Sequence, residues 1–179
     1  LRDRAIVETM YGAGLRISEL SGADVADLDL RRGEIRVMGK RRKQRIGLVG
    51  GPALDALQEW LEVGRPRLRG ASTAPDDGAL FLNVAGTRLG VRGIRLRFDG
   101  LARRAGLPDG LTPHTLPNTF ANHQLDRGAH LRVVQELLGH ASLATTQVYT
   151  HVTPARLRAS YRAAHPRATT SEPTTLPRT

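Results

Sequence analysis

The segment 27–49, DLDLRRGEIRVMGKRRKQRIGLV, changes the hydrophobic period of the chain and so limits the folds that it can adopt. Ile35 and Val37 alternate with polar neighbours, which is the two-residue period of a half-buried strand. Gly-containing or strongly polar stretches at 32–33 and 39–43 interrupt this pattern and are typical of turns. The sequence therefore predicts two or three short antiparallel strands in this segment.

Most of the remaining chain follows the helical period, in which apolar residues recur three or four positions apart. Helices are expected in LRDRAIVETMY (broken by GAG), in LRISELSGADV, and at 52–63, 91–106, 115–127, 130–138, 142–151 and 153–165. A polar connection, 64–78, precedes the short apolar stretch ALFLN. We therefore expect a mainly α fold with one small antiparallel β-sheet.

The chain of 179 residues suits a single domain over 1–165, followed by a Pro/Thr-rich tail, 166–179, that we expect to be disordered. It has 27 Lys and Arg against 17 Asp and Glu, a formal charge of +10, which favours a polyanionic partner such as nucleic acid. A basic surface without a specific partner is the alternative. No cysteine is present, which excludes disulfides and thiolate metal sites. Without a secretory signal or a long apolar run, the expected location is the cytoplasm.

Two cationic positions in the N-terminal half suit phosphate binding. Arg16 follows the GAGL turn at the expected start of a helix, where backbone N–H groups and a guanidinium fork can both hold an anion. Lys40 begins a run of five cations in six residues at a hairpin tip, where a lysine can protonate a leaving oxygen. A surface arginine and a solvated loop are the respective alternatives.

Three further residues in the C-terminal half have side chains that phosphoryl transfer uses. His114 opens an expected helix, His140 lies at a turn after an apolar helix, and Tyr149 follows nine residues later. A phenol is a covalent nucleophile when neighbouring groups help it to lose its proton, although a tyrosine near a helix end is more often a packing residue. The histidine spacings match no familiar zinc motif, so no metal site is expected.

The order of Arg16, Lys40, His114, His140 and Tyr149 resembles that of the tyrosine recombinase (phage integrase) family, and above all its Xer-type members. The similarity runs through YGAGLRISEL, VMGKRRKQRIGLV, HQLDRGAHLRVVQELLGHASLATTQVYTHV and AAHPRA, nearly the whole chain. The resemblance implies the family's catalytic-domain fold and site-specific DNA recombination through a 3′-phosphotyrosyl intermediate, without a metal or other cofactor.

The resemblance also implies a role for each matching residue. Tyr149 would be the nucleophile and Arg16 would clamp the scissile phosphate. Lys40 would protonate the leaving oxygen, His114 would manage the proton of the tyrosine, and His140 would hydrogen-bond the phosphoryl oxygens. The remaining cations of the hairpin and the helix before His114 are expected to contact DNA: Arg41, Arg42, Lys43, Arg45, Arg95 and Arg97.

One position departs from the family pattern of His-x-x-Arg. Here the sequence is His114-Thr115-Leu116-Pro117-Asn118, so Pro117 stands where a second phosphate-binding arginine is expected. Proline is tolerated in the first turn of a helix, so the domain is expected to fold, but it supplies no cation. We expect impaired cleavage, unless Arg95, Arg97 or another protomer supplies a guanidinium.

The implied partner is a double-stranded DNA recombination site, bound by a homo- or hetero-tetramer with a related recombinase, with no membrane and no small-molecule substrate. Xer-type proteins carry an N-terminal DNA-clamp domain, and the resemblance leads us to expect that this domain is absent from the chain. Chromosome dimer resolution is the expected process. A non-catalytic DNA-binding or regulatory partner in a heteromeric complex and a mobile-element integrase are the alternatives.

Overall fold

The computed structural model describes residues 1–39, 43–106, 112–113, 159 and 163, and predictions for other positions lie outside it. Helix α1 (Arg2–Gly12) leads into helix α2 (Ile17–Ser21) through a turn at Gly14, whose φ of 57° favours glycine. Ile6 and Met10 of α1 are buried, which confirms the apolar face predicted from their spacing.

The predicted antiparallel sheet is present and has three strands in the order β1-β2-β3. After the short 3₁₀ helix η1 (Val25–Asp27), the strands are β1 (Leu28–Asp29), β2 (Glu34–Met38) and β3 (Gln44–Leu48). Cα partners along the β2–β3 pair include Ile35 with Gly47 and Val37 with Arg45. The turn before β2 contains Gly33 at φ 65°, where an added Cβ would lie 2.5 Å from a backbone oxygen.

The next helical region is longer than the sequence predicts. Helix α3 (Gly51–Glu59) continues through the π-helical turn η3 (Trp60–Gly64) into helix α4 (Arg65–Gly70). The polar connection expected from position 64 therefore begins only after Gly70. Pro66 has no N–H for the usual i−4 bond, and proline is tolerated in the first turn of a helix, so α4 can start at this point.

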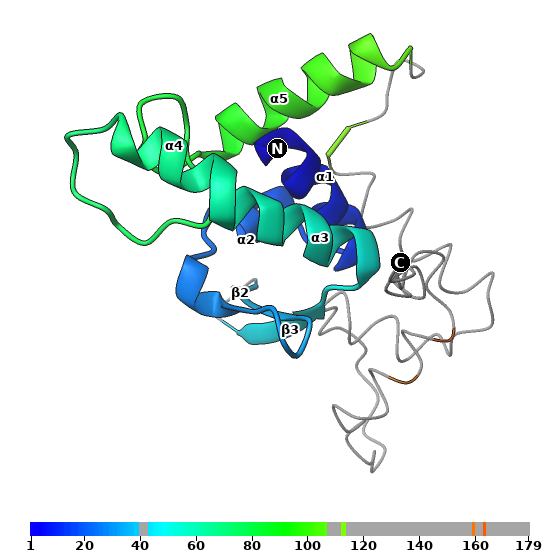
Figure 1. Ribbon diagram of the computed structural model, residues 1–179. Helices are drawn as coiled ribbons and strands as arrows, with labels where there is room; N and C mark the ends of the chain where they lie inside the picture. The colour runs from blue at the N-terminus through cyan, green and yellow to red at the C-terminus, as the bar shows by residue number, and fades with distance from the viewer. Residues whose placement is uncertain (40–42, 107–111, 114–158, 160–162, 164–179) are drawn as a thin grey trace, which may run out of the picture.

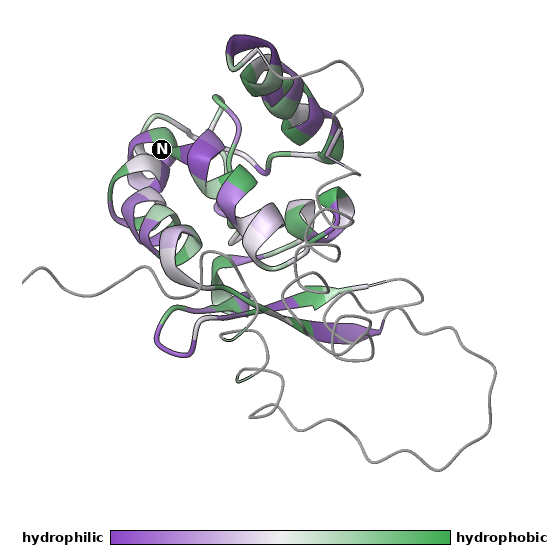
Figure 2. Ribbon diagram, turned by 90° about the vertical axis from the view of Figure 1, so that its right-hand side faces the viewer, coloured by the Kyte–Doolittle hydropathy of each residue, from purple (hydrophilic) through white to green (hydrophobic). Residues whose placement is uncertain are grey.

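The buried stretch Ala79–Leu82 and helix α5 (Val91–Arg104) complete the core. Trp60 Nε1 donates a 2.8 Å hydrogen bond to the Leu80 carbonyl, and its ring stacks on Phe81 with centroids 6.0 Å apart. Ile94 and Phe98 are the buried residues of α5, the helix at the top of Figure 2, whose ribbon alternates between hydrophilic and hydrophobic residues.

The elements form successive layers along the vertical direction of Figure 1. Helix α5 lies at the top, helices α1, α2 and α3 lie below it, and strands β2 and β3 lie at the bottom. No helix in the described part of the chain is long and apolar enough to cross a bilayer. Helix α2 lies between the sheet and α5 and contacts both of them.

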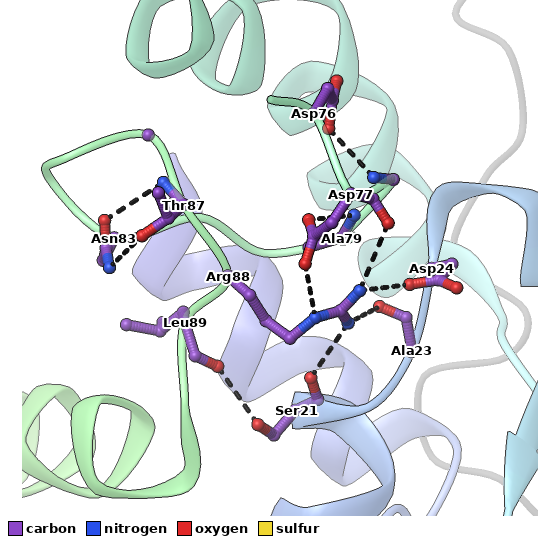
Figure 3. A network of polar contacts seen from close by, with 12 residues as sticks. Ser21, Ala23, Asp24, Asp76, Asp77, Ala79, Asn83, Thr87, Arg88 and Leu89 are labelled. Carbon is purple, nitrogen blue, oxygen red and sulfur yellow. Dashed lines mark hydrogen bonds and ion pairs between the residues drawn. The ribbon is translucent and has the colours of Figure 1, made fainter. Parts of the chain in front are cut away.

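Arg88 anchors the 77–89 segment to the end of α2 (Figure 3). Its Nη2 lies 2.6 Å from Asp24 Oδ1, its Nε lies 2.9 Å from Asp77 Oδ2, and its Nη1 donates to the Ser21 carbonyl at 3.3 Å. Burial acts to raise the pKa of Asp77, but hydrogen bonds from the Ala79 N–H and from Arg88 outweigh it and lower that pKa. Burial acts to lower the pKa of Arg88, but its hydrogen bonds to Asp24 and Asp77 outweigh this effect and raise it.

Candidate functional site

Arg16 occupies the N-cap position of α2, as the sequence predicts. Its neighbours Leu15 and Ile17 are buried, with 0% and 3% of their surface exposed, whereas the Arg16 side chain is 36% exposed. The backbone at Arg16 is extended, with φ −74° and ψ 150°, as is usual for a residue that precedes the first helical turn. The chain therefore presents one half-exposed guanidinium beside the start of a helix, an arrangement suited to an anion.

Glu19, three residues later, is the partner of Arg16. Its carboxylate accepts a 2.8 Å hydrogen bond from the Arg16 backbone N–H and a 2.9 Å hydrogen bond from Arg16 Nη1. Only 3% of Glu19 is exposed. Glu19 was not among the residues predicted from the sequence, although an acidic side chain at the third helical position is a known capping pattern that points to it.

Arg45 approaches the same carboxylate from strand β3. Its Nη2 and Nε lie 2.6 and 3.1 Å from the two Glu19 oxygens, and its Nη2 also donates to the Gly14 carbonyl at 3.1 Å. Its side chain is only 8% exposed. Arg45 was predicted to contact DNA, and the structure places its guanidinium against the Glu19 carboxylate and the Gly14 carbonyl, in the turn before Arg16.

The pleat of the sheet explains this position of Arg45. Successive side chains of a strand point to opposite faces, so Arg45 shares the inner face with Gly47 and with buried Ile35 and Val37 of β2. A Cβ at Gly47 would lie 3.1 Å from Leu15 Cδ2, which shows how closely β3 packs on the turn before α2. The small Gly47 thus allows the hairpin to bring Arg45 to Glu19.

The tip of the β2–β3 hairpin lies beside this cluster. The Gly39 N–H donates to the Lys43 carbonyl at 2.8 Å and so closes the hairpin. A Cβ at Gly39 would lie 3.6 Å from Glu19 Oε1, so the chain enters the tip next to the buried carboxylate. Lys43 is exposed, and Lys40, Arg41 and Arg42 lie outside the described residues.

Two further predicted DNA contacts lie on α5. Arg95 is exposed on this helix. Arg97 Nη1 lies 3.7 Å from Asp3 Oδ2 of α1, and its side chain is 42% exposed. The remaining predicted site residues lie outside the described part of the chain: His114, Pro117, His140 and Tyr149.

Of the predicted site residues that the structure describes, Arg16 and Arg45 converge on one carboxylate. Two guanidinium groups face a single buried negative charge, which leaves this cluster with a net positive charge. Such a cluster at a helix start attracts an anion, and guanidinium forks match phosphate geometry.

Comparison with known proteins agrees with these observations. The model of the phage integrase family matches residues 1–156. The chain is 52% identical over 169 residues to the tyrosine recombinase XerC of Pelotomaculum thermopropionicum, across 94% of this chain and 55% of that relative. It thus spans about half the length of the curated relatives it matches.

Solved structures show the same relationship. The crystal structure of XerA recombinase is similar with a TM-score of 0.70 and 34% identity, over 93% of this chain and 59% of that one. The XerH site-specific recombinase in a post-cleavage complex with palindromic difH substrate is similar with a TM-score of 0.65 and 26% identity, over 91% of this chain and 41% of that one. The family model that matches residues 1–156, the curated relatives and the shared fold lead to one conclusion: the chain belongs to the phage integrase family.

Proposed function

We propose that this chain is the catalytic domain of a site-specific tyrosine recombinase that binds and rejoins double-stranded DNA. The observation that carries the proposal is the half-exposed Arg16 guanidinium, held at a helix start by the buried Glu19 carboxylate. A preorganised cation of this kind stabilises charge that develops on a phosphate during the reaction. The match to the phage integrase family supports the same assignment.

The proposed reaction exchanges one phosphoester bond for another. The Tyr149 oxygen attacks the scissile phosphorus while His114 takes its proton, and the bond from phosphorus to the 5′-oxygen breaks. Lys40 gives a proton to that leaving oxygen, and Arg16 and His140 hold the non-bridging phosphate oxygens. The products are a 3′-phosphotyrosyl link and a 5′-hydroxyl, and attack by another 5′-hydroxyl reverses the step. This balance of bonds and protons needs no cofactor.

Pro117 is proposed to slow the cleavage step. Proline has no side-chain donor, so it cannot replace the second phosphate-binding arginine that the family pattern has at this position. Loss of an arginine that contacts the transition-state phosphate lowers the rate of comparable phosphoryl-transfer reactions by about 10³–10⁵-fold. DNA binding through the other cations would persist.

A phosphotyrosyl-trapping assay on nicked duplex DNA that carries the recombination site tests this function. We expect slow but Tyr149-dependent covalent product, which Tyr149→Phe abolishes, and faster product from the double variant Pro117→Arg/Asn118→His. Rapid trapping by the unaltered chain would contradict the impairment. No covalent product from either form, despite DNA binding, would favour the alternative of a non-catalytic partner, for which Pro117 is the supporting feature.

The biological process proposed for the whole protein is chromosome dimer resolution, which would place it in the cytoplasm. Relatives named XerC and a XerH structure that holds a difH substrate support this choice. The proposed assembly is a homo- or hetero-tetramer with a related recombinase on two DNA sites. Integration of a mobile element remains the alternative process, and mapping the genomic sites that the protein occupies separates the two.

A further inference from the structure

We propose that Arg45 is a positioning residue of the phosphate site and makes no contact with DNA itself. Its guanidinium fork holds Glu19 and the Gly14 carbonyl, so that Arg16 presents its own guanidinium to a DNA phosphate. This inference rests on the proposed function, because it assigns Arg45 to the same site. It replaces the expectation that Arg45 belongs to the row of DNA-contacting cations at the hairpin.

Burial and bonding separate Arg45 from its cationic neighbours along the hairpin. Lys43, two residues earlier, is exposed, whereas the Arg45 side chain is 8% exposed and bonds to Glu19 and Gly14. Arginine is rarely buried unless it is paired. To reach a DNA phosphate, Arg45 would have to leave Glu19, whose side chain is only 2% exposed. A buried charge without its partner is strongly destabilising.

The division of bonds at Glu19 explains how Arg45 acts on Arg16. Arg45 engages both Glu19 oxygens through Nη2 and Nε, whereas Arg16 bonds the carboxylate through Nη1. A guanidinium carries five N–H donors, so this single side-chain bond orients Arg16 and leaves other donors to face an anion. With Arg45 removed, both Glu19 oxygens would compete for the Arg16 fork and draw it away from the phosphate.

Arg45 also links the two segments that carry the proposed cations. It lies on β3, pairs with Val37 of β2 across the hairpin, and donates to the carbonyl of Gly14, two residues before Arg16. The hairpin passes Glu19 at Gly39, directly before Lys40. One guanidinium therefore ties the turn before Arg16 to strand β3, which follows the hairpin segment that contains Lys40 in the sequence.

The test measures how much affinity each variant loses when the charge of a single DNA phosphate is removed. A duplex selected from a random-sequence pool by binding to this chain is prepared with each linkage replaced in turn by a neutral methylphosphonate. Fluorescence anisotropy then gives the dissociation constant for each duplex. In the unaltered chain, we expect one linkage at which neutralisation weakens binding by about tenfold, and Arg16→Gln should remove most of that difference.

We call the ratio of dissociation constants between the neutralised and the unmodified duplex the discrimination at that linkage. Arg45→Gln should reduce this discrimination, at the same linkage, to nearly the level of Arg16→Gln. The double variant should show little further loss, because coupled residues are non-additive. Arg45→Lys retains the positive charge beside Glu19 but lacks the guanidinium fork. Its melting temperature should therefore be closer to that of the unaltered chain, but its discrimination should still be lost. The matched control is Arg67→Gln on exposed α4, which should retain the full tenfold difference.

The possible outcomes separate the two proposals. If Arg16→Gln leaves every linkage unaffected, the proposed phosphate clamp is wrong. If Arg16→Gln removes the discrimination but Arg45→Gln behaves like Arg67→Gln, only the positioning role is wrong. Loss of discrimination at a different linkage in Arg45→Gln would make Arg45 a direct DNA contact. Full discrimination in Arg45→Lys would overturn the requirement for the fork.

Discussion

At the scale of single residues, Glu19 is the group on which the candidate site depends. Its buried carboxylate receives hydrogen bonds from the Arg16 backbone, from the Arg16 side chain and from Arg45. The side chains of Arg45 and Glu19 are only 8% and 2% exposed. Removing either partner is therefore strongly destabilising, because the charge of the other stays buried without a counter-charge. Glu19 therefore contributes both to folding and to the orientation of Arg16.

Glu19→Gln should lower the free energy of unfolding by about 3–5 kcal/mol, because Arg45 would lose its buried counter-charge. Urea denaturation followed by circular dichroism measures this change. Glu59→Gln is the matched control, since Glu59 forms only a 3.5 Å pair with Arg4 between side chains 45% and 55% exposed. Its cost should stay below about 1 kcal/mol, and equal losses in the two variants would contradict the role of burial.

At the scale of secondary-structure elements, the π-helical turn η3 joins α3 to α4 and places Trp60 in the core. The Trp60 ring lies against Gly64, where an added Cβ would come within 2.4 Å of ring carbon Cε3. Trp60 is 1% exposed and has little room to move. An alanine at position 64 would therefore force the Trp60 ring or the helix backbone to shift.

Gly64→Ala should destabilise the protein by about 1–3 kcal/mol, as overpacking of a filled core does. Gly70→Ala, at the end of α4, has open space around its added methyl group and should change stability by less than about 1 kcal/mol. Thermal unfolding of both variants measures the difference. A Gly64→Ala protein as stable as Gly70→Ala would show that η3 can relax around the methyl group.

The segment from Asp76 to Leu89 is held by hydrogen bonds from Arg65 and Arg88 to two carboxylates, so its attachment should depend on pH. Hydrogen bonds from Arg65 lower the pKa of Asp76, and those from the Ala79 N–H and Arg88 lower that of Asp77 against the opposing effect of burial. A carboxyl whose pKa is lower in the folded state stabilises the protein above the ordinary value of 3.8. That contribution is lost as the pH falls through the lower folded-state pKa.

We therefore expect the melting temperature to fall as the pH drops below about 4, and less steeply in Arg88→Gln, in which Asp77 has lost a cation. Calorimetric scans across this range measure both slopes. Arg67→Gln, which removes an exposed arginine of α4, should keep the slope of the unaltered chain. An unchanged acid slope in Arg88→Gln would assign the pH dependence to other carboxyls.

At the scale of the whole molecule, the formal charge of +10 should make the proposed DNA binding dependent on salt. Each phosphate that a cation neutralises contributes about 0.9 to the slope of log affinity against log salt concentration. Lys43 is an exposed cation at the hairpin tip, whereas the side chain of Arg45, two residues further on, is only 8% exposed and is paired with Glu19. The two residues should therefore affect binding in different ways.

Lys43→Gln should reduce the salt slope by about one phosphate contact, with similar losses on all DNA sequences. Binding titrations at several sodium chloride concentrations measure this slope. Arg67→Gln removes the same charge from exposed α4 and should leave the slope nearly unchanged. Equal effects of the two variants would indicate a diffuse basic surface and not a hairpin that enters a groove.

The sequence alone was sufficient for α1, α2, α3, α5 and the antiparallel strands, because hydrophobic periods reflect local geometry. The two-residue period located β2 and β3, and the GAGL turn placed Arg16 at a helix start. The continuation into α4 was missed because RPRLRG is too polar to show a buried face. The roles of His114, Pro117, His140 and Tyr149 stay predictions, since these residues lie outside the described part of the chain.

Only the tertiary structure decided that Arg45 and Glu19 contact each other, because they are 26 residues apart and meet through the packing of β3 on the turn at Gly14. The charge run from Lys40 to Arg45 looks uniform in the sequence. The register of the β2–β3 pair decides which of its members turn inward, and the space left by Gly47 decides what an inward side chain can reach. An unpaired buried charge is costly, so the inward-pointing guanidinium of Arg45 forms an ion pair with the buried carboxylate of Glu19.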